Sequence, residues 1–417
     1  MQKVFPNCAG LDVHKRFVVA CRLTVDDQGH IHRKLHRFST MTKDLEALSN
    51  WLAQAGCSHV AMESTGIYWQ PVYNILEGSF EVYLVNAKHV KHVPGRKSDI
   101  QDAQWLAELL QHGLLKPSFI PPRQQRQLRD FVRYRQGLVE ERNRITNRIQ
   151  KVLEDANIKL SSVVSDIRGV SAQAILRELL AGQQDPQKLA QLARGRLKAK
   201  RTELEQALCG RLGAHHRFLL VRLLAHLDFL DEEISALQGQ IEVCLARMPS
   251  FCDAVDRLDT IPGVDRHTAT LIVAEIGVDM SRFPSDRHLT SWAGLAPGSN
   301  ETGGKHKPAR TRKGNRYLRR GLVQAARAAA RTRGTYLNAL YHRIASRRGK
   351  NRAAVAVART ILQICYHLIS QGQTYRDLGV DYFDRLDRER TTKRLVRRLE
   401  ALGFQVTLQE QPLVDAA

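Results

Sequence analysis

Several features that would assign this 417-residue chain to a common class are missing from it. Its seven cysteines are scattered and never form a Cys-x-x-Cys pair, which excludes a disulfide framework and a cysteine zinc site and favours the reducing cytoplasm. No run of about 18 apolar residues occurs, so we expect no membrane-spanning helix. The first residues, MQKVFPNCAGLDVHK, lack the apolar core of a signal peptide. We therefore expect a cytoplasmic protein.

Acidic residues are almost absent from one long stretch. Between Glu301 and Thr360 there are 17 lysines and arginines and a single acid, Glu301. A solvated protein face normally mixes both signs, so this stretch predicts a surface that binds a phosphate backbone. The net charge of +22 for the whole chain likewise indicates a polyanionic partner, and nucleic acid is the best candidate. We see no basic helix with an exposed aromatic face that would favour a membrane surface.

The first part of the chain, residues 1–120, predicts a mixed α/β layer fold. CAGLDVH, RFVVACRL and HIHRKLHRFST are typical of strands, and helical and strand patterns then alternate up to FEVYLVNA. Strands in series followed by alternating helices and strands favour a sheet covered by helices.

Residues 121–250 predict a helical region. One long pattern follows Pro121, with nine Lys/Arg and three Asp/Glu between Arg123 and Lys151. A second pattern has heptad spacing; its apolar positions are Leu220, Leu223, Leu227, Leu230, Ile234, Leu237, Ile241 and Cys244. Two interpretations are open, an antiparallel hairpin packed on itself and a coiled coil that joins two protomers. Residues 161–213 between them are helical and polar, and the pattern assigns them no task.

Residues 251–375 predict a mainly helical domain, and residues 376–417 a charged tail. IPGVDRHTATLIVAEIG has a Pro-Gly turn before an amphipathic helix, which is typical of half a helix-hairpin-helix. The backbone amides of such a turn can bind a phosphate, although the same turn is also common without a function.

The stretch KSDIQDAQW places two acids at the start of a predicted helix. Ser98 and Gln101 fit a capping box, so Asp99 and Asp102 fall on the first turn and share one face. The helix dipole favours acids there, which alone is a sufficient structural explanation.

Two further acids, Asp12 in GLDVHK and Glu63 in AMESTG, each end an apolar strand pattern. A buried carboxylate costs several kcal/mol without a partner, so each of these acids needs one. If the two strand ends lie side by side under the helix of Asp99 and Asp102, four carboxylates converge. Such an oxygen-only site suits Mg²⁺ or Mn²⁺.

The order of these acids resembles a known family. Asp in GLDVHK, Glu in MESTG and Asp-x-x-Asp in SDIQDA are similar to the DEDD domain, of RuvC/RNase H-like fold, in bacterial insertion-sequence transposases related to the Piv DNA invertases (the IS-one-ten and IS-eleven-eleven groups). The block LTSWAGLAPGSNETGGKHKPARTRKGNRYLRR resembles that family's second domain. The resemblance covers roughly residues 10–370 and is weak over 161–213, which resembles an insertion.

The resemblance implies an enzyme that recombines DNA under the direction of a structured guide (bridge) RNA. Asp12, Glu63, Asp99 and Asp102 would bind the metal, and a serine of the second domain would be the nucleophile, forming a covalent protein–DNA intermediate. This chain has Thr302 at that position, and an activated threonine is chemically competent, although its methyl group hinders attack. Ser299 is the alternative nucleophile, and an impaired variant is a third possibility.

We expect several other basic residues to bind nucleic acid. Near Thr302 they are Lys305, Lys307, Arg310, Arg312, Lys313 and Arg316. On the long basic helix we expect Arg126 and Arg133 to contact RNA. His14 either positions water or a proton or is only a neighbour of Asp12.

Two other functions compete with RNA-guided recombination. A junction-resolving nuclease would use the same acids with water as the nucleophile, and a binding protein would use them only as helix caps. We expect double-stranded DNA partners and a homo-oligomer, dimer or tetramer, because recombination joins two duplexes.

Overall fold

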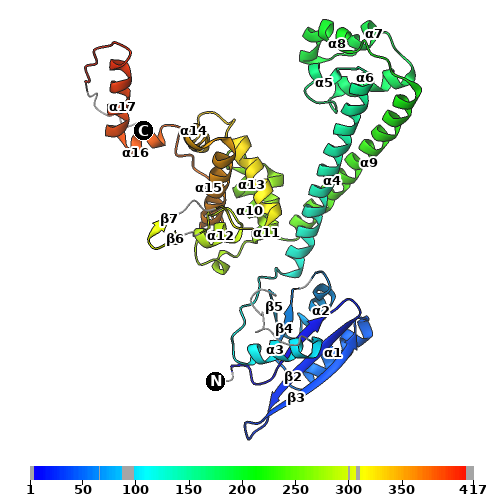
Figure 1. The fold of residues 1–417 in the computed structure, drawn as a ribbon, viewed down its shortest axis with the longest axis vertical. Helices are drawn as coiled ribbons and strands as arrows, with labels where there is room; N and C mark the ends of the chain where they lie inside the picture. The colour runs from blue at the N-terminus through cyan, green and yellow to red at the C-terminus, as the bar shows by residue number, and fades with distance from the viewer. Residues whose placement is uncertain (1–3, 65, 87–97, 299–300, 307–309, 410–417) are drawn as a thin grey trace. The chain divides into compact units, whose positions relative to one another are not determined.

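The computed structural model describes residues 4–64, 66–86, 98–298, 301–306 and 310–409. It divides into two compact units, Met1–Pro121 and Pro122–Ala417, and each is described by itself. Figure 1 shows the N-terminal unit as a sheet with helices and the second unit as helices with one small hairpin.

The N-terminal unit is built on one five-stranded mixed sheet with the order β3-β2-β1-β4-β5. β1 pairs antiparallel with β2, and β2 with β3, whereas β4 runs parallel to both β1 and β5. The strands are β1 Cys8–Val13, β2 Phe17–Val25, β3 Ile31–Ser39, β4 His59–Glu63 and β5 Glu81–Val85. The sheet predicted from the strand patterns is confirmed.

Helices cover both faces of this sheet. One face packs on α1 (Thr42–Ala53) and α2 (Trp69–Leu76), and the other packs on α3 (Asp99–Gln111). Gly10 in β1 allows α3 to approach, because a methyl group there would overlap the backbone of Ala103 and Ala107. The N-terminus of α3 is thereby held against the central strand.

The second unit begins with a long helical hairpin. α4 (Arg123–Asp155) packs along α9 (Ala214–Ala246), and a small group of helices fills the tip between them (Figure 1). These are α5 Leu160–Val163, α6 Val170–Ala181, α7 Pro186–Gln191, the 3-10 helix η1 Gly195–Lys200 and α8 Arg201–Ala207. The hairpin interpretation of the heptad pattern is confirmed, whereas no partner chain is present to test the coiled coil between protomers.

Three of the eight residues predicted for the packed seam of α9 are not fully buried, and two other leucines are buried in addition. Leu224 and Leu245 are buried, whereas Leu223, Leu237 and Cys244 are only partly so. A straight α-helix has 3.6 residues per turn. The residues on its packed side therefore shift gradually away from a strict seven-residue repeat.

The remaining elements form a helical domain with its own core. They are α10 Pro249–Asp259, α11 Arg266–Ile276, the 3-10 helix η2 Met280–Arg282, α12 Asp286–Trp292, β6 Glu301–Thr302, β7 Lys305–His306, α13 Arg316–Ala329, α14 Tyr336–Arg348 and α15 Lys350–Gln371. α11 is the helix predicted after the Pro-Gly turn, and Gly263 (φ +86°) in the turn between α10 and α11 packs closely against the backbone of α13. The tail holds two further helices, α16 Tyr382–Leu386 and α17 Arg388–Glu400.

α15 qualifies by length and composition as a helix that could cross a membrane, although no such helix was expected from the sequence. It packs against α10, α12, α13 and α14, and side chains such as Val357, Ile361 and Leu362 are buried in the C-terminal core. Its apolar composition is therefore that of a core helix.

Candidate active site

Strand alternation places two of the predicted acids on one face of the sheet. In β1, Cys8 and Gly10 face α3, so Asp12 faces it too. In β4, Ala61 faces α3, and Glu63 follows it by two residues. Leu11 pairs with Met62 in parallel register. Asp12 and Glu63, the next residues, therefore lie side by side at the C-terminal ends of β1 and β4.

The first turn of α3 brings the other two acids to this face. Ala103, Leu106, Ala107 and Leu110 are its buried stripe, and Asp99 and Asp102 precede the first two of these by four residues. Ser98 caps the helix, its side chain accepting a hydrogen bond from the Gln101 amide (3.3 Å). The two acids therefore lie on the side of α3 that meets the sheet.

His14 connects the strand to the helix. Its Nε2 lies 3.0 Å from Asp12 Oδ2 and 3.5 Å from Asp99 Oδ2. Donor atoms of Asp12, His14 and Asp99 all lie within 4.8 Å of one another, close enough to share one cation. Sequence reasoning left His14 as either a participant or a neighbour, and its contacts make it part of the cluster.

Electrostatics at Asp12 fit a cation site. Burial raises the pKa of Asp12 above the usual aspartate value, the charges of Asp99 and Asp102 raise it further, and His14 opposes both. Asp12 is 15% exposed and Asp99 50%, so the cluster opens to solvent on the helix side. A carboxylate group with these neighbours gains from a bound divalent cation, and carboxylates are the ligands that hard cations prefer.

The predicted nucleophile lies on a two-stranded hairpin in the second unit. β6 pairs antiparallel with β7, and Thr302 pairs with Lys305. Gly303 (φ +56°) and Gly304 (φ +72°) form the connecting turn, and two consecutive positive φ angles are what a tight hairpin turn requires. Thr302 thus borders an exposed Gly-Gly tip. Ser299 and Lys307 lie outside the described residues.

The base of this hairpin is fixed by close backbone contacts. Pro297 pairs with Thr311, and the Gly298 amide donates to the Arg310 carbonyl (3.1 Å). Side chains cannot fit at Gly294 or Gly314, because each would meet the other's backbone. Gly294 of the WAGL segment and Gly314 of the KGNR segment therefore position the hairpin.

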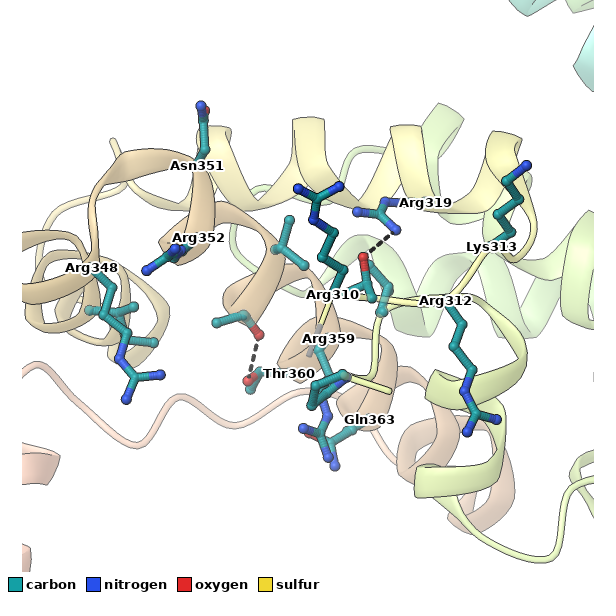
Figure 2. Close-up of a pocket in the computed structure, with 16 residues that line it drawn as sticks. Arg310, Arg312, Lys313, Arg319, Arg348, Asn351, Arg352, Arg359, Thr360 and Gln363 are labelled. Atoms are coloured by element: carbon teal, nitrogen blue, oxygen red, sulfur yellow. Dashed lines mark hydrogen bonds between the residues drawn. The ribbon is translucent and has the colours of Figure 1, made fainter. Parts of the chain in front are cut away.

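A cationic pocket of about 1240 Å³ lies beside the hairpin base (Figure 2). The cations that line it come from the loop before α13 and from α13, α14 and α15. They are Arg310, Arg312, Lys313, Arg319, Arg348, Arg352 and Arg359. No acid occurs among the described residues that line it. Within the described chain, the buried Nε of Arg359 has no hydrogen-bond partner. The pocket therefore offers donors and positive charge to an anion.

The predicted basic residues fall into different surroundings. Arg310, Arg312, Lys313 and Arg316 are exposed, as a nucleic-acid surface requires. By contrast, Arg133 is partly buried and engaged in an ion pair, with Nε 2.6 Å and Nη2 2.8 Å from the two carboxylate oxygens of the fully buried Glu275.

Other exposed cations of α4 lie farther along the helix than Arg126 and Arg133. Arg126 is half-buried and has partners of its own. Arg144, Arg148 and Lys151 are exposed, and each is three or four residues from the next. They therefore share one face of the helix. The number of charges in the sequence does not distinguish these exposed cations from the arginines that form ion pairs within the protein.

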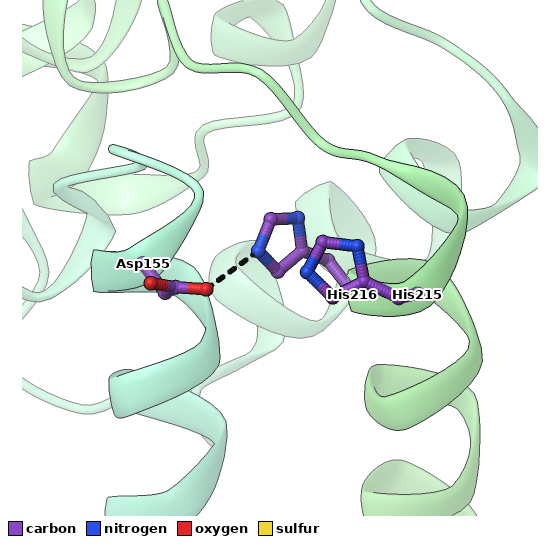
Figure 3. A group of neighbouring side chains, drawn as sticks. All are labelled: Asp155, His215 and His216. Atoms are coloured by element: carbon purple, nitrogen blue, oxygen red, sulfur yellow. Dashed lines mark hydrogen bonds and ion pairs between the residues drawn. The ribbon is translucent and has the colours of Figure 1, made fainter.

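A second cluster of metal-ligating residue types, Asp155, His215 and His216, lies where α4 ends and α9 begins (Figure 3). The Gly213 amide donates to Nδ1 of His216 (3.1 Å), so Nε2 carries the proton and donates to Asp155 Oδ2 (2.8 Å). Both nitrogens of His216 are then occupied. We interpret this cluster as a clip that joins the two helices.

Comparisons with known proteins match both regions. A transposase model of the DEDD type, DEDD_Tnp_IS110, matches residues 9–158, and a model described as the transposase IS116/IS110/IS902 family matches residues 255–342. Together the two matches span more than half of the chain. The chain belongs to the IS110/IS116 transposase family. The first match contains all four predicted acids and the second contains the hairpin with Thr302.

Two transposases are similar to this one over most of their length, and a gene-inverting protein over about half of its length. It is 29% identical to the transposase for insertion sequence element IS1111A of Coxiella burnetii over 337 residues, covering 78% of this chain and 80% of that one. It is 26% identical to the IS1328 transposase of Yersinia enterocolitica over 365 residues, covering 83% and 95%. A pilin gene-inverting protein of Moraxella bovis is 29% identical over 148 residues, covering 35% and 46%.

Proposed function

We propose that this transposase cuts and rejoins DNA strands with a metal-binding DEDD site and a hydroxyl nucleophile. The observation that carries the proposal is the approach of Asp12, His14 and Asp99 around one point, with Glu63 and Asp102 on the adjoining strand end and helix turn. The strand order supports a RuvC/RNase H-like fold for the N-terminal unit. The similarity to a pilin gene-inverting protein supports recombination of DNA.

The proposed metal ligands are Asp12, Glu63, Asp99 and Asp102, with Mg²⁺ or Mn²⁺ as the ion. When bound, such a cation would stabilise negative charge developing on a phosphodiester. His14 would orient Asp12 and Asp99 toward the ion through its contacts with both carboxylates.

Thr302 is the proposed nucleophile. Its hydroxyl oxygen would bond to phosphorus while the bond from phosphorus to one deoxyribose oxygen breaks, and the threonine proton would leave with the displaced group. The phosphodiester is conserved as a protein–DNA ester, so the strands can be rejoined without an added energy source. We propose that this hydroxyl meets the carboxylate site of its own or another protomer, in a dimer or tetramer.

The cationic pocket is the proposed seat of the DNA backbone next to the reacting bond. It has seven cations and lies at the base of the hairpin that carries Thr302. Cations so placed also neutralise charge that develops during phosphoryl transfer. Arg310, Arg312 and Lys313 line this pocket and are retained as proposed DNA-contacting residues. Lys305 and Arg316 are retained because they flank these residues in the sequence.

A guide RNA is the proposed source of sequence choice. The exposed face of α4 formed by Arg144, Arg148 and Lys151 is its proposed contact, because these cations have no acidic partner in the described part of the chain. Replacing Arg144 and Arg148 by glutamine should weaken RNA retention on a filter, whereas the same change at Arg196 and Lys198, in η1, should not. Equal retention by both variants would remove the α4 face from the proposal.

A suicide DNA substrate tests the central claim. Such a substrate loses its leaving strand after cleavage, so a nucleophilic side chain stays linked to DNA. We expect an adduct whose mass maps to Thr302 and which Thr302→Ser retains and Thr302→Val loses. Clean hydrolysis without an adduct would instead favour the alternative function, a junction-resolving nuclease in which water attacks.

A further inference from the structure

A second cationic groove, of about 550 Å³, lies between α14 and the tail helix α17. Arg343 and Arg347 line it from α14, and Phe383 of α16 contributes an aromatic ring. The cations from α17 are Arg390, Lys393, Arg394 and Arg397. Asp387 and Glu389 are the acids among the described residues that line it. Six cations thus face two acids in one small space.

Few of these cations are neutralised within the protein. Arg390 and Arg394 make long contacts of 3.9 Å with Asp387 and Asp384. The described residues provide no ion-pair partner for Arg347, Lys393 or Arg397. Like charges that converge without partners repel one another, and an anion in the groove would remove this repulsion.

The orientation of α17 is the second observation. Arg390, Lys393 and Arg397 share the face that lines the groove. The opposite face carries Leu395 and Leu399, which are 51% and 43% exposed. A surface helix normally packs through its apolar stripe. Here the exposed cationic face is the one directed toward α14, which is favourable when the groove holds a polyanion.

The aromatic ring in the groove is already covered. Phe383 stacks on Tyr336, with centroids 5.4 Å apart and an interplanar angle of 23°, and the Arg343 guanidinium lies 5.0 Å from its centroid. An unpaired base would need a free aromatic face for stacking. The groove therefore suits a sugar–phosphate backbone and offers little for reading bases.

We propose that the α14–α17 groove binds the backbone of duplex DNA outside the bonds that are exchanged. Successive residues of α14 link it to the first site, because Arg347 lines this groove and Arg348 lines the hairpin pocket. α17 lies outside both regions that the family models match. The choice of DNA as the ligand rests on the proposed recombination function.

The test compares two adjacent arginines of the full-length protein. Arg397 lines the groove and Arg398 does not, and both are exposed on α17. Binding of a short duplex DNA of arbitrary sequence would be followed by fluorescence anisotropy over a range of salt concentrations. In a plot of the logarithm of the association constant against the logarithm of the salt concentration, the slope is negative. Arg397→Gln should reduce its magnitude by about one, whereas Arg398→Gln should leave it unchanged. Arg347→Gln, on the other wall, should act like Arg397→Gln.

Equal slopes for Arg397→Gln and Arg398→Gln would overturn the groove as a site. A loss confined to duplex RNA, measured with the same variants, would overturn DNA as its ligand. The assay requires neither strand exchange nor metal, so an absent Thr302 adduct would not affect it. Failure of this inference and failure of the proposed chemistry are therefore distinguishable.

Discussion

Arg133 of α4 and Glu275 of α11 form a two-pronged ion pair although they are 142 residues apart in sequence. Arg129 adds its guanidinium to the same carboxylate at 3.6 Å, and the Asn315 amide donates to it at 2.5 Å. Asn315 also caps α13, since its side-chain oxygen accepts from the Tyr317 and Leu318 amides. One buried carboxylate therefore ties the long hairpin to the segment that follows Thr302.

Glu275→Ala should strongly destabilise the second unit, because it leaves two partly buried arginines uncompensated. We expect the free energy of unfolding to fall by about 3–5 kcal/mol, measured by denaturant titration. Arg144→Ala, at an exposed position of α4, should change it by no more than about 0.5 kcal/mol. A similar small change for Glu275→Ala would mean that the ion pair contributes little to folding.

Gly10→Ala should displace α3 from the sheet, because the added methyl group overlaps the backbone of Ala103 and Ala107. Overpacking of this kind costs about 1–3 kcal/mol or more, and it should lower the melting temperature. Gly78→Ala is the matched control, since a methyl group there meets no atom within 4 Å. Equal melting temperatures for the two variants would contradict the close approach of α3.

Asp12→Asn should abolish stabilisation by Mg²⁺. A cation that binds the folded chain at 100 times its dissociation constant adds about 2.7 kcal/mol of stability, seen as a rise in melting temperature. Without metal the substitution should cost little, because burial and the charges of Asp99 and Asp102 already disfavour ionised Asp12. Asp27→Asn, at an exposed turn of the same unit, should keep the full response. A metal response that survives in Asp12→Asn would exclude Asp12 as a ligand.

His267 should make the second unit less stable in acid. Burial, together with the nearby Arg135, lowers the pKa of His267 from 6.5 to about 4. Below pH 6.5 the unfolded chain takes up a proton that the folded chain refuses, so stability is lost as the pH falls toward 4, with a slope of at most about 1.4 kcal/mol per pH unit.

His267→Gln isolates this contribution, because the other titrating groups remain in place. Subtracting its unfolding free energies from those of the unaltered chain, measured from pH 7 to pH 4, should give the expected slope. Parallel curves for the two proteins would show that His267 takes up its proton in the folded state.

Local patterns predicted the parts of the fold that depend on neighbours in sequence. The alternation in CAGLDV and HVAME predicted the strands of Asp12 and Glu63, and the cap at Ser98 predicted the start of α3. The strand ends could be expected to meet because both acids follow apolar runs.

Contacts between distant segments could not be predicted in this way. The contact of His14 with Asp99 depends on how α3 lies across β1, which nothing near His14 in the sequence specifies. Arg133 looked like any other cation of α4 because its partner, Glu275, lies in another helix. The cations that α14 and α15 add to the hairpin pocket come from helices whose packing brings them to the loop.

The antiparallel course of α4 and α9 also has a mechanical meaning. With 33 residues each, both helices are about 50 Å long. The helices at the tip are therefore carried on a lever, so a small tilt at its root sweeps them through a large arc. Because α4 and α9 lie side by side and both pack on the C-terminal core at one end, residues can be added to or removed from the tip without changing the path of the rest of the chain.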